Sequence, residues 1–125
     1  MESFSPNIFV ENMNETIAFY SVLGFKTVMS VPETGDFVWV MMSCGNVNMM
    51  FQTFKSLGDE FPQISRNRGG SLSFYIKTSH IRDLFHRIEK QVVVIKGLEK
   101  TFYNATEFSI LDNNGYVLTF AEDEV

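Results

Sequence analysis

The residues of this sequence that could carry chemistry are a carboxylate and two tyrosines in its second half. Glu107 comes just before the last apolar hairpin and alternates with Phe108 and Ile110, so its side chain could face a cleft. A carboxylate there could anchor a cationic ligand or act as a general base; the alternative is a solvated strand residue. Tyr75 and Tyr103 could also exchange protons, but a tyrosine near its ordinary pKa of ~10 is a poor base.

Five further residues of reactive type give less specific signals. Trp39 is suited to stack on a planar or cationic group, although packing at a sheet or subunit interface would explain it equally. Cys44 precedes a turn glycine with no histidine nearby in sequence, so we interpret it as structural rather than nucleophilic. His80 and His86 fall outside the apolar stripe of their helix, and we interpret both as exposed. We interpret Asp112 as a turn residue that bonds to its own backbone.

Length and composition indicate one domain of ordinary size, residues 1–125, with 45% hydrophobic residues. The net charge of −5 argues against sequence-independent binding to nucleic acid, which needs a basic face. No apolar run approaches the roughly 18 residues of a membrane span. The first residues, MESFSPN, lack a signal-peptide pattern, so we expect a cytoplasmic protein. The single cysteine excludes an internal disulfide and a multi-cysteine metal site.

Aromatic and sulfur-containing side chains are abundant: 13 Phe, 7 Met, 4 Tyr and 1 Trp. One interpretation is a Phe-rich core. The alternative is that some of these side chains line an apolar pocket, because Met and aromatic residues suit adaptable binding surfaces.

Two apolar hairpins organise the sequence and indicate that it has two similar halves. Residues 108–122 form two apolar runs around Asn114-Gly115, a strong hairpin signal because both residues tolerate positive φ. Residues 37–51 repeat the pattern around Gly45-Asn46. We therefore expect a first half at residues 4–54, a linker at residues 55–70 and a second half at residues 71–122.

In the first half we expect a strand, a helix and three further strands. Pro6 lacks a backbone N–H, so we expect the opening strand to lie at a sheet edge or to join the sheet only after residue 6. Asn12 or Asn14 is predicted to cap the helix, and Gly24 to end it.

The second half is predicted to repeat this order. Thr78 or Ser79 would cap a helix that continues through Glu89, Gly97 would break a short strand, and residues 122–124 would form a solvated tail. The predicted fold class is therefore α+β: two βαβββ repeats forming a curved mixed sheet with the helices on its convex face.

Two stretches of the sequence resemble a known family. Residues 15–25 read ETIAFYSVLGF, and residues 108–122 read FSILDNNGYVLTFAE. They resemble the first helix and the last hairpin of the vicinal oxygen chelate superfamily, which includes glyoxalase I, extradiol dioxygenases, fosfomycin-resistance enzymes and bleomycin-resistance proteins. The resemblance covers essentially the whole chain and implies a pair of βαβββ units.

The resemblance also implies four positions at which enzymes of this superfamily hold a divalent metal with His, Glu or Gln. These positions fall at Ser5, Met49, Ser71 and Thr119, with Asn48 as the alternative to Met49. Hydroxyl and thioether groups are not ordinary ligands of such metals. We therefore predict no metal, no cofactor and no catalytic residues of the usual type.

The alternation of the predicted strands places a set of mostly aromatic, sulfur-containing and hydroxyl side chains on the concave face. We predict that the following residues bind ligand: Trp39, Met41, Met49, Phe51, Ser71, Ser73, Tyr75 and Glu107. Such a surface suits a small-molecule pocket better than a metal centre.

Three functions remain open. The first is a metal-free binding protein similar to the bleomycin-resistance branch, a homodimer that sequesters an apolar, aromatic or cationic small molecule in a cleft at the dimer interface. The second is a lyase, isomerase or dioxygenase of the same superfamily with a displaced or non-standard site. The third is a structural or protein-interaction module with no ligand. We expect neither nucleic acid nor membrane as a partner.

Overall fold

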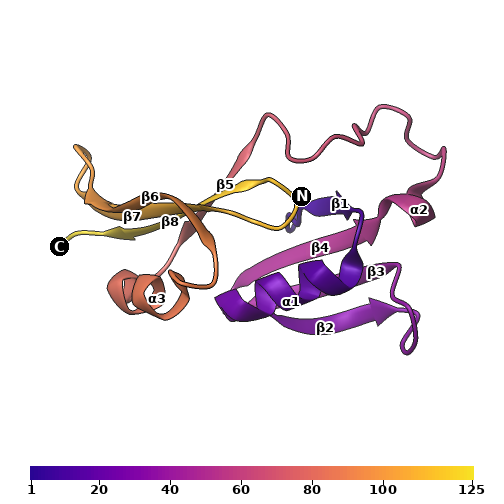
Figure 1. Ribbon diagram of the computed structural model, residues 1–125, viewed down its shortest axis with the longest axis horizontal. Coiled ribbons are helices and arrows are strands. Elements are labelled where there is room, and N and C mark those ends of the chain that lie inside the picture. Colours follow the sequence, from indigo (N-terminus) through magenta and orange to yellow (C-terminus); the bar gives the residue numbers. More distant parts are fainter. The chain divides into compact units, whose positions relative to one another are not determined.

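The computed structural model describes residues 1–125 and divides them into two compact units, Met1–Arg66 and Asn67–Val125. Each unit contains one four-stranded sheet and a helix that packs on it (Figure 1). The boundary between the units falls inside the segment 55–70 that the sequence predicts as a linker.

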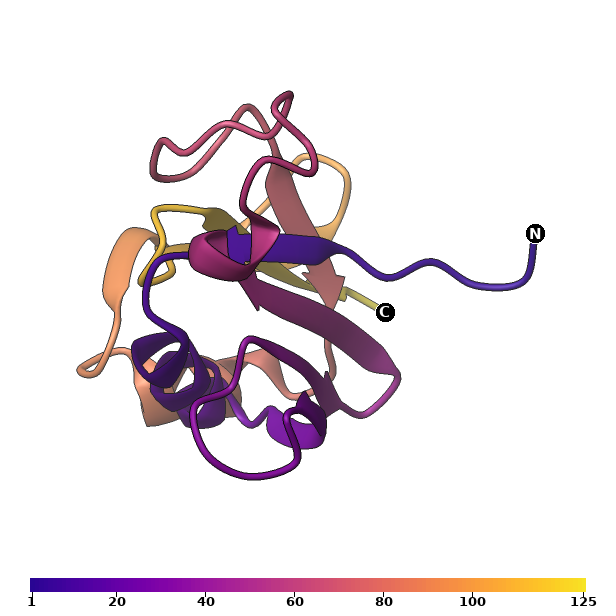
Figure 2. The same cartoon turned by 90° about the vertical axis from the view of Figure 1, so that its right-hand side faces the viewer.

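The first unit is a βαβββ repeat with one short additional helix. Its elements are β1 (Asn7–Val10), α1 (Met13–Leu23), β2 (Lys26–Val31), β3 (Trp39–Cys44), β4 (Val47–Thr53) and α2 (Phe54–Leu57). The sheet order is β1-β4-β3-β2, with β1 parallel to β4 and the other pairs antiparallel. Strand β1 is thus an edge strand, as Pro6 predicts. Figure 2 shows the segment before β1 running away from this sheet.

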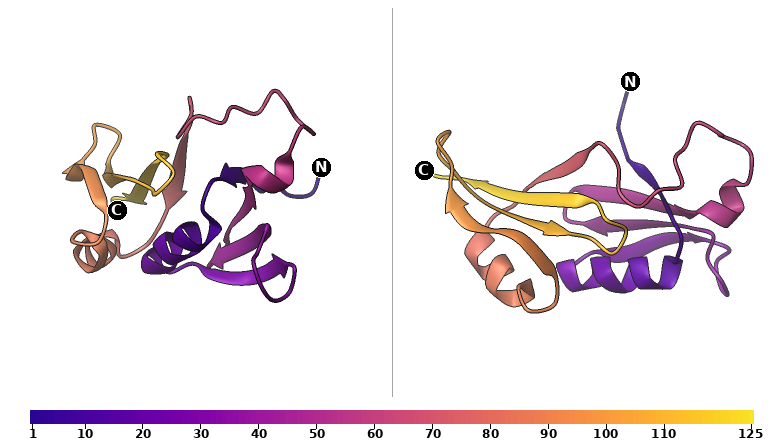
Figure 3. Two further views of the ribbon diagram at one scale, coloured as in Figure 1. Left: turned by 45° about the vertical axis from the view of Figure 1, so that its right-hand side comes forward. Right: turned by 45° about the horizontal axis from the view of Figure 1, so that its top comes forward.

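Helix α1 begins and ends where the sequence predicts. The side chain of Asn12 accepts a hydrogen bond from the backbone N–H of Glu15 at 2.9 Å. Gly24 ends the helix in the left-handed conformation, with φ of 108°. From α1, the fully buried Tyr20 reaches the sheet, where its ring centroid lies 4.7 Å from that of Phe51 and 5.5 Å from that of Phe25. Figure 3 shows α1 lying along one face of its sheet, and these buried rings pack between the two.

The second unit repeats the same arrangement. Its elements are β5 (Ser73–Lys77), α3 (Ile81–Ile88), β6 (Val93–Lys100), β7 (Ala105–Leu111) and β8 (Val117–Asp123). The sheet order is β5-β8-β7-β6, with β5 parallel to β8 and the other pairs antiparallel. The structure therefore confirms the predicted α+β fold of two βαβββ repeats, and each repeat forms its own mixed sheet.

Helix α3 packs its apolar stripe on the second sheet. Ile81, Leu84 and Ile88 are buried. Phe85 extends the stripe and meets Phe108 of β7 edge to face, with ring centroids 5.0 Å apart. Phe108 in turn stacks on Phe120 of β8 at 5.1 Å, so the last hairpin supplies the aromatic core of this unit.

The start of α3 differs from the sequence prediction. Neither Thr78 nor Ser79 caps it; the cap residue is His80, whose φ is 55° and whose side chain makes no capping bond. The carboxylate of Glu122, on β8, instead accepts hydrogen bonds from the backbone N–H groups of His80 (2.9 Å) and Ile81 (3.1 Å). Residues 122–124 are therefore not a solvated tail, because Glu122 closes the helix start from a neighbouring strand.

Strand β6 also differs from its prediction, because it continues through Gly97 to Lys100. The register shifts between Val94 and Lys96 and again between Lys96 and Glu99, so the glycine lies within an irregular stretch of an edge strand. A glycine in a strand commonly accompanies such an irregularity without ending the strand.

The turn between β7 and β8 is built as predicted around Asp112. Its Oδ1 atom accepts hydrogen bonds from the backbone N–H groups of Asn114 (2.9 Å) and Tyr116 (2.8 Å). Gly69 packs on this turn: its N–H donates to the Asn114 carbonyl at 2.7 Å, and a Cβ at Gly69 would lie 2.6 Å from the Gly115 carbonyl oxygen. Only glycine fits this close approach of two backbones.

The helices of the structure are all too short or too polar to cross a membrane.

Candidate functional site

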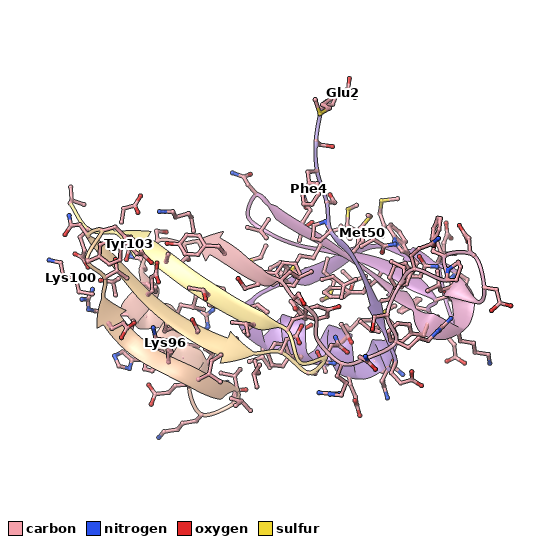
Figure 4. The ribbon with its side chains drawn as sticks, turned by 90° about the horizontal axis from the view of Figure 1, so that it is seen from above. Glu2, Phe4, Met50, Lys96, Lys100 and Tyr103 are labelled. Carbon is pink, nitrogen blue, oxygen red and sulfur yellow. The ribbon has the colours of Figure 1, made fainter.

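Each sheet has one side that its own helix does not cover, and most of the predicted ligand residues lie there. The first open face, in Met1–Arg66, comprises Asn7, Phe9, Met29, Val31, Trp39, Met41, Met50 and Gln52. The second open face, in Asn67–Val125, comprises Ser73, Tyr75, Lys77, Lys96, Glu99, Glu107, Ser109, Thr119 and Ala121. Met50 of the first open face and Lys96 of the second are labelled in Figure 4.

The first open face is mainly apolar and centres on Trp39. Trp39 pairs with Val31 on β2 and with Gln52 on β4, and the neighbouring Met41 pairs with Met29 and Met50. The indole is half-buried and has no aromatic or cationic partner in the structure. The predicted residues Trp39 and Met41 thus lie close together on this face, and the indole is partly exposed.

The prediction that Met49 and Phe51 also lie on this face is wrong. They are 2% and 0% exposed and point to the opposite side, where Phe51 packs on Tyr20. Side chains alternate along a strand, so a shift of one residue in the assignment moves each side chain to the other face. Counting outward from the Gly45-Asn46 turn pairs Trp39 with Gln52, and this count identifies Met50 and Gln52 as the open-face residues.

The second open face is polar and brings two predicted residues, Tyr75 and Glu107, into contact. The hydroxyl of Tyr75 donates to Oε2 of Glu107 at 2.5 Å, and the hydroxyl of Tyr103 donates to the same oxygen at 2.5 Å. We call Tyr75, Tyr103 and Glu107 the Tyr-Glu-Tyr cluster. Tyr75 and Tyr103 are 50% and 52% exposed, so the cluster is open to solvent.

The strand between β5 and β7 explains how Tyr75 and Glu107 meet. Tyr75 is on β5 and Glu107 on β7, and β8 separates them with Ala121 directly beside Glu107. Because the side chain of Ala121 is small, it does not block the contact between the two longer side chains. Tyr103 comes from the loop between β6 and β7, and the tight turn at Thr101 holds it there through the backbone bond from Asn104 N–H to the Thr101 carbonyl at 3.2 Å.

The carboxylate of Glu107 keeps the phenols of Tyr75 and Tyr103 protonated. The hydrogen bond from Tyr75 to Glu107 raises the pKa of Tyr75 well above the ordinary value of 10.0, and the hydrogen bond from Tyr103 to Glu107 raises the pKa of Tyr103. The phenolate form is disfavoured because it would place a second negative charge beside Glu107. Both tyrosines therefore remain protonated hydrogen-bond donors at neutral pH.

The two lysines of the second open face are engaged elsewhere. Lys96 pairs with Glu99, Nζ to Oε1 at 2.8 Å, which is the main reason that the pKa of Lys96 is raised; Glu107 adds to it. Lys77 pairs with Asp123 and lies 5.7 Å from the ring centroid of Tyr75. Figure 4 shows Lys96 and Tyr103 at the same end of this sheet.

The positions that the resemblance assigns to a metal do not supply a matching donor set. Ser5 and Ser71 precede β1 and β5, and Met49 is in the core. The Thr119 hydroxyl lies 2.7 Å from the hydroxyl of Ser109. No group of three His, Cys, Asp or Glu residues comes together anywhere in the chain. These residues do not fit a divalent ion.

Of the remaining candidates, only Ser73 lies on an open face. Ser71 is exposed in the loop before β5, while Ser73 is exposed on β5 itself. His80 and His86 are exposed, as predicted, and Cys44 is half-buried. A shallow depression of ≈390 Å³ along β2, lined by Thr27, Val28, Met29, Ser30 and Glu33, contains none of the predicted ligand residues.

The family of the chain follows from its sequence and agrees with this fold. Residues 4–120 match the model of the Glyoxalase/Bleomycin resistance protein/Dioxygenase superfamily. The chain therefore belongs to this superfamily. A search of curated proteins gave no match.

Solved structures of low sequence identity share the fold. A protein of unknown function from Agrobacterium tumefaciens str. C58 is 21% identical, with a TM-score of 0.81 over 98% of this chain and 94% of that one. A glyoxalase/bleomycin resistance protein/dioxygenase family enzyme from Burkholderia phytofirmans PsJN is 19% identical (TM-score 0.76; 94% and 95% covered). A bleomycin-binding protein complexed with bleomycin is 18% identical (TM-score 0.67; 99% and 100% covered).

Proposed function

We propose that this protein binds an apolar, aromatic or cationic small molecule without using a metal. The observation that carries the proposal is Trp39, a half-buried indole without a stacking partner on a face of Met and aliphatic side chains. An apolar face with a few polar groups, such as the amides of Asn7 and Gln52 bonded to each other at 3.1 Å, suits a planar organic ligand.

The superfamily supports ligand binding as a function. One structural neighbour is a bleomycin-binding protein complexed with bleomycin, so the fold can hold a small organic molecule. The metal chemistry of the enzymes finds no support in this chain, because hydroxyl and thioether groups occupy the positions of the metal ligands.

The Tyr-Glu-Tyr cluster supports an acid–base enzyme less well than it supports a binding protein. Two phenols already donate to Oε2 of Glu107, and the raised pKa values of Tyr75 and Tyr103 make both weaker acids. A catalytic base or acid works best when its pKa lies near the working pH. The cluster is therefore better suited to holding a charge in place than to moving a proton.

We further propose that the protein works as a homodimer with its ligand cleft at the dimer interface. The support is the edge strand β2, where Val28, Met29 and Val31 are 55%, 58% and 51% exposed. Apolar side chains on an exposed edge strand favour pairing with another chain. Light scattering coupled to size-exclusion chromatography tests this: a mass near the 14.4 kDa of one chain would contradict the dimer.

The test of ligand binding uses the fluorescence of Trp39, the single tryptophan of the chain. A panel of uncharged aromatic, cationic aromatic and cationic aliphatic compounds is titrated while the emission of Trp39 is recorded. We expect at least one aromatic compound to change the emission and to raise the melting temperature. Calorimetry with Trp39→Ala should then show weakened binding, whereas Phe102→Ala, a change at a 99% exposed loop residue, should bind normally.

The proposal fails if no compound of the panel changes the emission, the melting temperature or the heat of titration. That result would favour a structural or protein-interaction module, the third function that the sequence leaves open.

A further inference from the structure

Glu107 presents one carboxylate oxygen that the protein leaves without a partner. Both phenol hydroxyls of the Tyr-Glu-Tyr cluster donate to Oε2, and Oε1 accepts no hydrogen bond from the chain. The phenols fix the direction of the carboxylate, so Oε1 is held in place before any ligand arrives. A preorganised acceptor of this kind loses little conformational entropy on binding.

No side chain of the protein neutralises this carboxylate by a direct ion pair. Lys96 is bonded to Glu99 at 2.8 Å, and Lys77 is paired with Asp123. The cations of the second open face are thus already committed to other acids. A charged group of a ligand would find Glu107 available.

The phenol rings add a second attraction for a cation. The rings of Tyr75 and Tyr103 are half-exposed beside Glu107. Lys77 lies 5.7 Å from the ring centroid of Tyr75, which shows that this ring already has a cation within the range of a cation–π contact. The face of a phenol ring attracts a cation, so a cation bound to Glu107 has aromatic groups of the right type beside it.

From this geometry we propose that the Tyr-Glu-Tyr cluster is by itself a binding site for the alkylammonium group of a small molecule. A single available oxygen favours an ammonium, which makes one short N–H···O bond, over a guanidinium, which binds carboxylates best with two parallel bonds. The inference goes beyond the proposed function, because it concerns the second open face alone and does not depend on Trp39.

The loop that carries Tyr103 contributes to the order of the proposed ammonium site. Thr101 N–H donates to the Ala105 carbonyl at 2.8 Å, and Ala105 N–H donates to the Thr101 hydroxyl at 3.1 Å. Asn104 completes the turn in the left-handed conformation, with φ of 65°. These bonds close the loop on itself and place Tyr103 above Glu107, four residues further along the chain.

The direct test is a titration of the ¹⁵N-labelled protein with 2-phenylethylammonium, followed by NMR, with uncharged 2-phenylethanol as the matched probe. We expect the ammonium to shift the amide signals around residues 75, 103 and 107, and the alcohol to leave them in place. Glu107→Gln should weaken binding of the ammonium by about tenfold or more, because a charge-assisted hydrogen bond is lost. Tyr103→Phe, which removes one of the two hydroxyls that orient the carboxylate, should weaken it less.

The matched control is Glu89→Gln, which removes the same charge from the helix on the other side of this sheet. Glu89 contacts His86 at 3.2 Å and no residue of the cluster, so its change should leave binding of the ammonium unaltered. Glu107→Asp keeps the charge and serves as the variant that separates a loss of charge from a loss of folding. Equal binding by the wild type and Glu107→Gln, or an equal loss with Glu89→Gln, would overturn the proposal.

The two proposals can fail separately. If Trp39→Ala abolishes binding of the panel ligands while Glu107→Gln binds an ammonium ligand normally, the proposed ammonium site is wrong and the proposed function stands. If 2-phenylethylammonium shifts the amide signals of the cluster but no panel compound needs Trp39 for binding, the proposed ammonium site stands and the proposed role of Trp39 is wrong. If the wild type binds neither kind of probe, both proposals are wrong.

Discussion

Thr119 and Ser109 face each other across β8 and β7, with their hydroxyl oxygens 2.7 Å apart. Thr119 stands where the superfamily resemblance places a carboxylate that binds metal. Its hydroxyl is instead bonded to a neutral neighbour, and neither group brings a negative charge. Two residues before Ser109 on the same strand β7, a carboxylate does lie on this face: Glu107, with two phenols bonded to it.

The first prediction concerns metal content. Purified protein should contain no stoichiometric Ni, Zn, Mn or Fe by plasma mass spectrometry, because hydroxyl and thioether groups do not form a site for these ions. Dialysis against EDTA should leave both the melting temperature and the affinity for any ligand of the fluorescence panel unchanged. Thr119→Glu should not create tight binding either, since one carboxylate is too few donors. One equivalent of bound metal in the wild type would contradict this prediction.

The second prediction concerns the carboxylate that closes helix α3. Replacing Glu122 by Gln removes the charge that accepts the backbone N–H groups of His80 and Ile81. We expect the melting temperature at pH 7 to fall by roughly 3–6 °C. Asp123→Asn is the matched control, because the Lys77–Asp123 pair is exposed and such pairs contribute little. Equal shifts for the two variants would show that Glu122 does not act as a cap.

The carboxylate of Glu122 should also make the stability of the protein depend on pH. The hydrogen bonds from Ile81 and His80 lower the pKa of Glu122 below its ordinary value of 4.5 in the folded state. In the unfolded chain the group therefore takes up its proton first, and its stabilising contribution is present above pH 4.5 and lost as the pH falls through the lower folded value. The difference in melting temperature between wild type and Glu122→Gln should consequently shrink between pH 6 and pH 3.

The fold could be predicted from the sequence because its signals are local. Asn12 and Gly24 mark the ends of α1, and the apolar stripe of α3 lies within one helix. The cap of α3 could not be found in this way, because Glu122 lies 41 residues from Ile81 and only the sheet brings them together. The prediction that Gly97 ends a strand failed for a related reason. Strand β7 is distant in the sequence, and pairing with it continues β6 through the irregular stretch.

The candidate site was only partly predictable. Alternation identified Trp39, Tyr75 and Glu107, but an error of one residue in β4 exchanged Met49 and Phe51 for Met50 and Gln52. The contact between Tyr103 and Glu107 depends on a four-residue turn whose shape the sequence does not specify. The contact between Tyr75 and Glu107 spans 32 residues and a strand between them, so only the assembled sheet reveals it.

The third prediction concerns the titration of the tyrosines. The bond to Glu107 raises the pKa of Tyr75 and Tyr103 above 10.0. In an absorbance titration at 295 nm these two should ionise late, and Glu107→Gln should move part of the curve to lower pH. Because the folded pKa is raised, the unfolded chain loses its phenol protons first, and the stability from these bonds falls as the pH rises above 10. An identical curve for the variant would contradict the two hydrogen bonds.

The fourth prediction concerns the glycine that packs on the last hairpin. Gly69→Ala should destabilise the second unit by about 1–3 kcal/mol, since φ is +69° and the new Cβ would lie 2.6 Å from the Gly115 carbonyl oxygen. Gly97→Ala is the matched control, because nothing lies within 4 Å of a Cβ at that position. Urea denaturation measures both variants. A neutral Gly69→Ala would mean that the loop does not rest on the turn.

The fifth prediction compares two phenylalanines of the second unit that differ in burial. Phe108 is 1% exposed between Phe85 and Phe120, whereas Phe102 is 99% exposed. Phe108→Ala should lower the free energy of unfolding by about 3–5 kcal/mol, because it leaves a cavity where three rings meet. Phe102→Ala should change it by no more than about 0.5 kcal/mol. Urea denaturation followed by circular dichroism gives both values, and hydrogen exchange of the β7 and β8 amides shows whether the loss falls in this unit. Similar losses for the two variants would contradict the placement of Phe108 in the core. If Phe108→Ala does not fold at all, Phe108→Leu can be measured in its place. It should lower the free energy of unfolding by less, because it leaves a smaller cavity.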